Sequence, residues 1–238
     1  SLGWSIETPT KMAADYESTE DHEGTGVMAT NGDYFNMGTG EPLGYLIMEG
    51  NQIKTTGEPY FAILNNGTAV IRAAGSDCSD VKEAISGPFL IAKDGQYTWE
   101  CSTDTSVMPR NSIGIRADGS VVLFLNDGRQ APKSLGMTLK ECASVMLDAG
   151  CVDVLYLDGG GSASVSARAE GSSQLKVVNS PSDGAEREVA SGLLIVSTAE
   201  SSGVFDHASI APYDELYTPG SQIRFEATGA DSAGFPAE

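Results

Sequence analysis

Short apolar runs separated by turn residues dominate the chain, and this pattern predicts a fold made mostly of β-strands. Several runs are joined by Asn, Asp and Gly, which tolerate the left-handed backbone of a tight turn, so these segments are predicted hairpins. Written as strand, turn and strand, they are residues 60–64, 65–67 and 69–71; 89–91 followed by the turn 93–95; and 113–116, 117–119 and 121–125. Further strands are predicted at residues 27–30, 152–157, 175–178 and 189–196.

Two helices interrupt the strands. Thr8 before Pro9 predicts an N-cap followed by a proline at the first helical position, and a short helix over residues 11–17. Thr138 and Glu141 have the spacing of a capping box, in which two otherwise unpaired N–H groups are satisfied reciprocally. The second helix is further marked by one apolar face and a C-terminal glycine, namely Leu139, Cys142, Ala143, Met146, Leu147 and Gly150.

The composition shifts to small and polar residues after Thr198. We therefore predict an α+β domain over residues 1–198, with a mixed, strand-rich sheet and a few packed helices. Residues 217–229 resemble the opening strands of an immunoglobulin-like module, so residues 199–238 are predicted to be the truncated start of an all-β, immunoglobulin-like domain. The abrupt start at Ser1 without a signal peptide predicts a piece cut from a longer, exported protein.

Composition and charge exclude several classes of function. The chain has 14 Lys and Arg against 33 Asp and Glu, a net charge of −19 that repels nucleic acid and anionic membranes. No apolar run approaches the ~20 residues of a membrane span. The acidic, lysine-poor composition fits a secreted or cell-surface protein. Oligomeric state is not indicated.

Metal and histidine chemistry have little support. Only two histidines are present, and the chain has neither a CxxC pair nor an Asp-x-Asp-x-Asp calcium loop, so we assign no cofactor and no metal. The glycines around Ser162 do not match a nucleophile elbow, which argues against a serine hydrolase. Four cysteines allow three complete disulfide pairings, and the sequence does not choose among them.

The strongest chemical signal is the run Asp158-Gly159-Gly160-Gly161-Ser162 at the end of a predicted apolar strand. Consecutive glycines let a ligand approach the main chain and present N–H groups in a row, as in an anion nest. Asp158 would then be a partly desolvated carboxylate beside that row. The alternative is an ordinary glycine-rich turn capped by Asp158.

A second carboxylate and three arginines also lie in loop contexts. Asn31-Gly32-Asp33-Tyr34-Phe35 follows a buried strand and is either a tight turn or a carboxylate beside an aromatic wall. Arginine suits bidentate recognition of phosphate. Among Arg110, Arg129 and Arg187, the segment around Arg110 has little other charge and makes it the better clamp, whereas Arg187 between two glutamates suits an ion pair.

The order of these motifs resembles the phosphodiester glycosidase family over about residues 27–197. The motifs that carry the resemblance are Asn31-Gly32-Asp33-Tyr34-Phe35, Ser86-Gly87-Pro88-Phe89-Leu90, Pro109-Arg110-Asn111-Ser112-Ile113-Gly114-Ile115, Asp127-Gly128-Arg129 continuing into Gly136-Met137-Thr138, Leu157-Asp158-Gly159-Gly160-Gly161-Ser162 and Asn179-Ser180-Pro181-Ser182-Asp183-Gly184-Ala185-Glu186-Arg187. Asn111 departs from the threonine that the family often has there. The resemblance implies hydrolysis of a sugar-1-phosphodiester at the anomeric carbon, with N-acetylglucosamine as a suggested sugar.

Roles follow from this reaction. A phosphate leaving group is already acidic, so the transition state needs its growing negative charge held and its oxocarbenium-like sugar matched by a carboxylate. We expect Arg110 and Arg187 to hold the phosphate and Asp158 to face the anomeric carbon as base or nucleophile. Asp33 would orient a sugar hydroxyl or act as general acid. The expected substrate contacts are Asn31, Gly159, Gly160, Gly161, Ser162 and Asn179.

Two other functions remain open from the sequence. A non-catalytic, cell-surface carbohydrate-binding module would accord with the predicted tail, although Trp4 and Trp99 are the only tryptophans available for stacking on a sugar. A phosphoesterase would break the P–O bond instead of the C–O bond. The expected partner in every case is a glycan or sugar phosphate.

Overall fold

The computed structural model describes residues 3–213 and 216–238 and confirms a strand-rich chain with two α-helices, α1 (Pro9–Ser18) and α2 (Leu139–Asp148). The strands are β1 (Thr25–Asn31), β2 (Leu46–Met48), β3 (Asn51–Lys54), β4 (Tyr60–Leu64), β5 (Ala69–Arg72), β6 (Val81–Ser86), β7 (Phe89–Lys93), β8 (Gln96–Tyr97), β9 (Arg110–Arg116), β10 (Val121–Asn126), β11 (Cys151–Tyr156), β12 (Val165–Arg168), β13 (Leu175–Val177), β14 (Gly192–Ser197), β15 (His207–Ala211) and β16 (Glu226–Ala230). Two short 3₁₀ turns, η1 (Trp99–Ser102) and η2 (Gly160–Ser162), complete the set.

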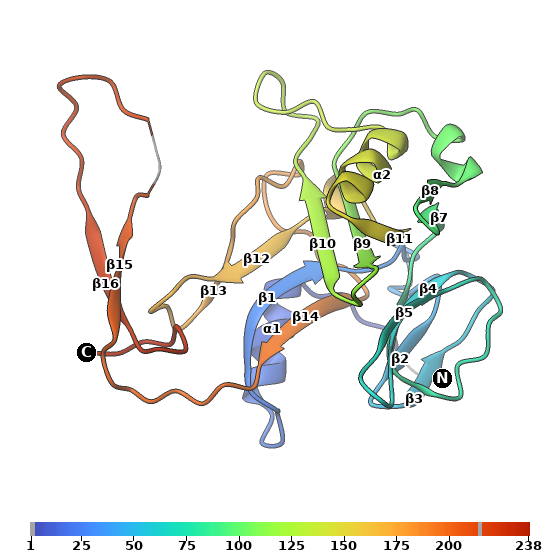
Figure 1. Ribbon diagram of the computed structural model, residues 1–238, viewed down its shortest axis with the longest axis horizontal. Coiled ribbons are helices and arrows are strands. Elements are labelled where there is room, and N and C mark those ends of the chain that lie inside the picture. Colours follow the sequence, from blue (N-terminus) through green and yellow to red (C-terminus); the bar gives the residue numbers. More distant parts are fainter. Residues whose placement is uncertain (1–2, 214–215) are drawn as a thin grey trace.

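Three sheets form the body of the molecule (Figure 1). Their strand orders are β10-β9-β11-β7-β8, β3-β2-β6-β4-β5 and β13-β12-β1-β14. The predicted mixed sheet is wrong in this respect, because the strand pairs in the described part of the chain are antiparallel. Hairpins or short connections join the neighbours β2–β3, β4–β5, β7–β8, β9–β10 and β12–β13, which is a connectivity that antiparallel pairing allows.

The three predicted hairpins are confirmed as β4–β5, β7–β8 and β9–β10. Each turn contains a glycine with positive φ, at Gly67, Gly95 and Gly119. This left-handed backbone suits glycine, which is why the turn residues identified the hairpins correctly. The predicted strand at residues 189–196 starts later, because Val189 pairs with Glu7 as an isolated bridge before β14 begins.

Helix α1 begins as predicted, with the Thr8 hydroxyl accepting a hydrogen bond from the Lys11 N–H at 3.2 Å. The helix packs on β1 and β14, and its Ala13 side chain is buried. Glu186, far along the chain, accepts hydrogen bonds from the backbone N–H and the hydroxyl of Thr10 at 3.3 and 3.1 Å. Helix α1 therefore anchors the long loop that precedes β14.

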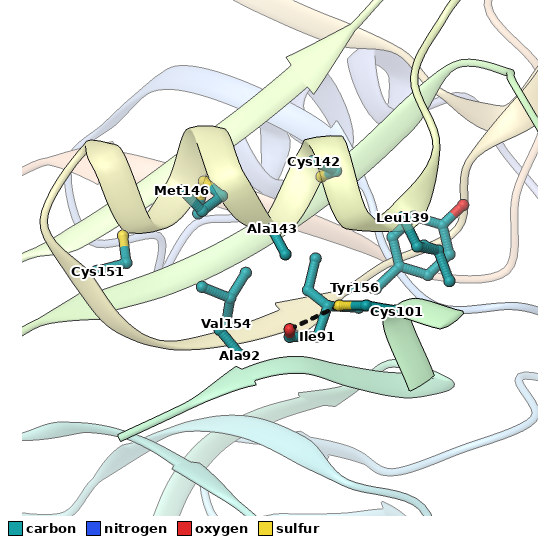
Figure 2. Packing of buried hydrophobic residues seen from close by; sticks show 10 residues of the cluster. All are labelled: Ile91, Ala92, Cys101, Leu139, Cys142, Ala143, Met146, Cys151, Val154 and Tyr156. Atoms are coloured by element: carbon teal, nitrogen blue, oxygen red, sulfur yellow. Dashed lines mark hydrogen bonds between the residues drawn. The ribbon is translucent and has the colours of Figure 1, made fainter. Parts of the chain in front are cut away.

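Helix α2 covers one face of the sheet that contains β9 and β11. Its capping box forms as predicted between Thr138 and Glu141. Figure 2 shows its apolar face against β7 and β11, where the Cys101 thiol donates to the Ile91 carbonyl oxygen at 2.9 Å. None of the disulfide pairings is present, since the four cysteines, Cys78, Cys101, Cys142 and Cys151, are free.

The opposite face of that sheet packs on β4, β5 and β6. The apolar layer between the two sheets consists of Phe61, Ile71, Ile85, Ile113, Ile115, Leu155 and Leu157. Strands β9 and β11 are therefore buried on both faces, and their ends are held in place from two sides. The end of β11 meets the end of β1 next to this layer, where the Asp158 N–H donates to the Gly32 carbonyl oxygen at 2.9 Å.

After β14 the chain leaves the body and forms the hairpin β15–β16, which projects away from the sheets (Figure 1). The predicted immunoglobulin-like character of this tail is not confirmed: residues 217–225 are not strands, and β15 precedes the segment in which strands were predicted. The hairpin contacts the body at the β12–β13 connection, where the Ser209 hydroxyl donates to Glu170 at 2.6 Å. Among the described residues, no helix is long and apolar enough to cross a membrane.

Loss of the capping box should weaken the helix that supports β11. Thr138→Ala removes the hydroxyl that accepts from the Glu141 N–H, and we expect the free energy of unfolding to fall by about 1 kcal/mol in urea denaturation. Thr68→Ala, at the exposed β4–β5 turn, is the matched control and should change it by less than about 0.5 kcal/mol. Equal losses in the two variants would contradict the capping role.

Candidate active site

The site forms where β1 and β11 end and β9 begins. The Asn31 side chain, fully buried at the end of β1, donates to the Asp158 carbonyl oxygen at 2.8 Å. Its own amide oxygen accepts hydrogen bonds from Asn111 at 3.0 Å and from the Ser164 N–H at 3.1 Å. Asn31 therefore braces the loop that carries Asp158, and Asn111 belongs to the same buried network.

Asp158 is a half-buried carboxylate with an altered acidity. Burial raises its pKa to about 6, and the negative charge of Asp33 acts in the same direction. A hydrogen bond from Ser162 and the positive charge of Arg187 lower the pKa and offset part of this rise. The group is thus mostly ionised at pH 7 yet binds a proton readily, which suits a base or nucleophile.

Asp33 lies beside Asp158 but is almost fully buried, with 3% of its surface exposed. One carboxylate oxygen accepts from the Ser86 hydroxyl and the other from the Tyr34 N–H, both at 2.7 Å. Burial raises the pKa of Asp33, while these two hydrogen bonds oppose the rise. Gly44 leaves the necessary room, because a Cβ there would stand 2.5 Å from an Asp33 oxygen.

Each glycine of the Gly159-Gly160-Gly161 run touches a different part of the molecule. A Cβ on Gly159 would lie 2.6 Å from the Pro109 carbonyl oxygen and closer still to the Tyr156 hydroxyl. A Cβ on Gly160 would lie 3.2 Å from the Arg129 guanidinium, and one on Gly161 would overlap the Arg187 guanidinium. The bare Cα atoms of Gly159 and Gly161 are therefore what allow their neighbours to approach, while Gly160 has a positive φ and lies in close contact with Arg129.

The main-chain N–H groups of this run are used partly inside the protein. The Gly160 N–H donates to the Pro109 carbonyl oxygen at 2.9 Å, and the Ser162 N–H donates to the Gly159 carbonyl oxygen at 3.2 Å. The predicted row of N–H groups for an anion is thus interrupted. The glycine run therefore serves mainly to let other groups approach the main chain, and it supplies fewer free hydrogen-bond donors than predicted.

Arg110 does not face a free site. Its side chain is fully buried, and its N–H groups donate to the Met137 carbonyl oxygen (2.9 Å), Asp104 (3.0 Å), the Tyr156 hydroxyl (3.2 Å) and Ser106 (2.6 Å to the carbonyl oxygen). Since protein acceptors occupy the guanidinium, this geometry does not support the clamp role predicted for it. Arg110 instead fixes Tyr156, whose ring it also overlies at 5.4 Å.

Arg187 is partly exposed and forms an ion pair, as one interpretation of the sequence allowed. Its partner is Asp183, whose Oδ2 lies 2.5 Å from Nη2 and 2.9 Å from Nε of Arg187. The predicted partners, the two neighbouring glutamates, do not form this ion pair. The remaining donor, Nη1, reaches the Ser162 hydroxyl at 3.2 Å. Arg187 thus lies within the Asp158 site and retains part of its surface for a ligand.

Asn179 holds the long loop in place. Its amide donates to Asp127 at 3.0 Å and to the Ala163 carbonyl oxygen at 3.2 Å, and its oxygen accepts from the Val165 N–H at 3.0 Å. Like Asn31, it supports the backbone around the site, and its three polar contacts here are with protein groups.

Three residues near the site were missing from the predicted set, namely Arg129, Tyr34 and Tyr156. The rings of Tyr34 and Tyr156 meet edge to face at 6.5 Å, and burial raises the pKa of both phenols. Tyr156 was visible in the sequence as the penultimate residue of an apolar strand, where an aromatic residue suggests only packing. In the described part of the chain, no group of three or more His, Cys, Asp or Glu side chains could hold a metal ion.

A family model covers the residues of this arrangement. The family model for phosphodiester glycosidase matches residues 24–196, which contain all the motifs described above. The chain belongs to the phosphodiester glycosidase family. The match begins and ends within three residues of the extent predicted from the sequence, and it excludes the β15–β16 hairpin.

Individual relatives of the family are more distant. Mouse N-acetylglucosamine-1-phosphodiester alpha-N-acetylglucosaminidase is 28% identical over 160 residues, covering 57% of this chain and 31% of the mouse protein. An uncharacterized Bacillus subtilis protein derived from the SPbeta prophage is 41% identical over 87 residues, which are 37% of this chain and 12% of that protein. The chain thus spans less than a third of the length of these curated relatives.

A solved structure shows the same fold. The zebrafish N-acetylglucosamine-1-phosphodiester alpha-N-acetylglucosaminidase catalytic domain, auto-inhibited by its pro-peptide, superposes with a TM-score of 0.64 at 22% identity. The superposition covers 81% of this chain and 68% of that chain. The strand-rich arrangement around the Asp158 loop is therefore the fold of this catalytic domain.

The raised pKa of Asp158 predicts a pH-dependent gain in stability when its charge is removed. Between the pKa of an unfolded aspartate, about 4, and the folded value of about 6, the folded state binds more protons than the unfolded state. The free energy of unfolding of the wild type therefore falls as the pH rises through this window. We expect Asp158→Asn to melt at a higher temperature than the wild type at pH 7.5 and at a similar temperature at pH 4.

The control for this measurement is Asp118→Asn at the β9–β10 turn. Hydrogen bonds from Ser120 lower the pKa of Asp118, so this variant should show no gain at pH 7.5. A melting temperature of Asp158→Asn equal to or below that of the wild type at pH 7.5 would refute the raised pKa.

Proposed function

We propose that this chain is a hydrolase that cleaves a sugar-1-phosphodiester at the anomeric carbon and releases a free sugar and a phosphomonoester. The observation that carries the proposal is the half-buried Asp158 carboxylate, with a pKa of about 6, beside two guanidinium groups on consecutive glycines. Family membership and the names of the mouse and zebrafish relatives support this reaction and favour N-acetylglucosamine as the sugar.

The proposed reaction needs only water as co-reactant. The oxygen of water bonds to the anomeric carbon, and the bond from that carbon to the phosphoryl oxygen breaks with its electron pair staying on the phosphoryl group. Asp158 faces the anomeric carbon as base or nucleophile, because its ionised form predominates at neutral pH. The proton of water ends on the carboxylate or in solvent. No strong general acid is needed, since a phosphate monoester is a good leaving group.

Asp33 acts in this scheme through Asp158. With 3% of its surface exposed it has little access to a substrate, but its negative charge raises the pKa of Asp158. Its orientation is fixed by Ser86 and Tyr34. We therefore assign Asp33 to tuning and orientation, and we assign Arg110 and Asn31 to holding the loop that carries Asp158 and the glycines.

We also propose a secreted or cell-surface location. The net charge of −19 and the small number of lysines support it. Burial raises the pKa of the thiols of Cys101, Cys142 and Cys151, which makes them poor nucleophiles, so free cysteines are compatible with oxidising surroundings.

Turnover of the methyl phosphodiester of N-acetylglucosamine-1-phosphate tests the function. Asp158→Asn keeps the shape of the side chain but loses its charge, so kcat/KM should fall about 10²–10⁴-fold. Asp118→Asn, far along β9–β10 and exposed, should keep the wild-type value. In ¹⁸O-water the label should appear in the sugar, because the bond broken is C–O.

Three results would count against the proposal. Binding of the diester by the wild type without turnover would favour a carbohydrate-binding module. Label in the phosphate would indicate a phosphoesterase that breaks the P–O bond. Equal rates for the wild type and Asp158→Asn would remove Asp158 from the mechanism.

A further inference from the structure

Arg129 occupies an unusual position next to the glycine run. It is exposed and has φ +58, in the left-handed region that side chains rarely adopt. Its loop is nonetheless well held. The Arg129 N–H donates to the Leu135 carbonyl oxygen at 3.1 Å. The Gln130 side-chain amide donates to the Ser180 carbonyl oxygen at 2.6 Å and accepts from the Ser180 hydroxyl at 2.8 Å. The fold therefore fixes the Arg129 backbone between two loops of the site.

The Arg129 side chain lies over the bare Cα of Gly160. A Cβ at Gly160 would stand 3.2 Å from both terminal nitrogens of the guanidinium. The next residue, Gly161, has the Arg187 guanidinium in the equivalent position. Two cationic groups from separate loops thus meet consecutive glycines, which lie two and three residues after Asp158 in the chain.

The charge on Arg129 is not neutralised by the protein. Its hydrogen bond is to the Met108 sulfur at 3.3 Å, a weak acceptor, and it forms no ion pair with any residue in the described ranges 3–213 and 216–238. Arg110 and Arg187, in contrast, are paired with Asp104 and Asp183. Arg129 is therefore the arginine of this site with donors available for an anionic ligand.

An unpaired cation matters in a site of this charge. Asp33 and Asp158 repel a phosphodiester, and the chain as a whole carries a net charge of −19. A guanidinium matches phosphate oxygens with two parallel N–H groups. As the bond to the anomeric carbon breaks, the phosphoryl group passes from one negative charge towards two, so a fixed guanidinium stabilises the transition state more than the ground state.

We propose that Arg129 binds the phosphoryl group of the leaving group over Gly160 and makes this site selective for phosphodiester-linked sugars over glycosides with neutral leaving groups. This inference rests on the proposed function, and it gives Arg129 the role that the sequence had suggested for Arg110. Arg187, already shared with Asp183, supports the same phosphoryl group from Gly161.

Activity on two substrates distinguishes a variant that no longer recognises the leaving group from a variant that has lost its structure. One is the methyl phosphodiester of N-acetylglucosamine-1-phosphate, and the other is p-nitrophenyl N-acetyl-α-glucosaminide, whose leaving group carries no phosphate. We expect Arg129→Ala to lower kcat/KM for the diester about 10²-fold or more, as for loss of one donor to a developing oxyanion, and to change the neutral glycoside less than about threefold. Arg129→Lys should recover part of the diester activity, because it restores the charge without the planar fork.

Arg224→Ala is the matched control, since Arg224 is an exposed arginine outside the family region, and it should leave both activities unchanged. Equal losses on both substrates in Arg129→Ala, or no loss on the diester, would overturn the proposal. Thermal melting of each variant shows whether it is folded.

A binding measurement tests the inference even when turnover is absent. Inorganic phosphate is titrated into the wild type and Arg129→Ala and followed by calorimetry. We expect the affinity to fall about tenfold or more, as for loss of a charged hydrogen bond. Unchanged affinity would overturn the phosphate role of Arg129. If the wild type hydrolyses neither substrate, the proposed function fails, and this titration alone decides the inference.

Discussion

The close approach of three separate loops to the main chain of Gly159, Gly160 and Gly161 is the constraint on which the site depends. Tyr156 and Pro109 at Gly159, and Arg187 at Gly161, occupy space that a Cβ would need, and the Arg129 guanidinium lies against Gly160. Such a run loses more conformational entropy on folding than any other sequence of this length. The neighbouring strands β9 and β11 are packed on both faces, and this packing offsets the conformational entropy that the glycines lose.

The same convergence creates an electrostatic cost that a purely structural turn would avoid. Two carboxylates, Asp33 and Asp158, lie in a partly desolvated region where burial raises the pKa of both, and the negative charge of Asp33 raises the pKa of Asp158 further. Arg187 and Ser162 lower the pKa of Asp158 but leave it near 6. A carboxylate with this acidity beside partly available guanidinium groups suits the proposed hydrolysis of a phosphodiester-linked sugar, and stability alone would not select it.

Local patterns in the sequence predicted the hairpins, both helices and the chain segments of the site, because turn glycines, capping residues and apolar faces act over a few neighbours. The roles of the arginines depended on distant partners. The sequence predicted an Arg110 without an acidic partner because Asp104 lies outside its motif. Its buried contact with Tyr156 arises only when β9 pairs with β11. Arg129 gave no sign of its position over Gly160, since that contact joins loops about thirty residues apart.

A crystal structure of Asp158→Asn soaked with N-acetylglucosamine-1-phosphate measures this convergence directly. We expect this variant to fold and to turn over slowly, so the ligand should remain intact. We predict phosphate density within hydrogen-bond distance of the Arg129 guanidinium over Gly160, with the anomeric carbon facing residue 158. Phosphate bound elsewhere on the protein, or a sugar whose anomeric carbon points away from residue 158, would contradict the account.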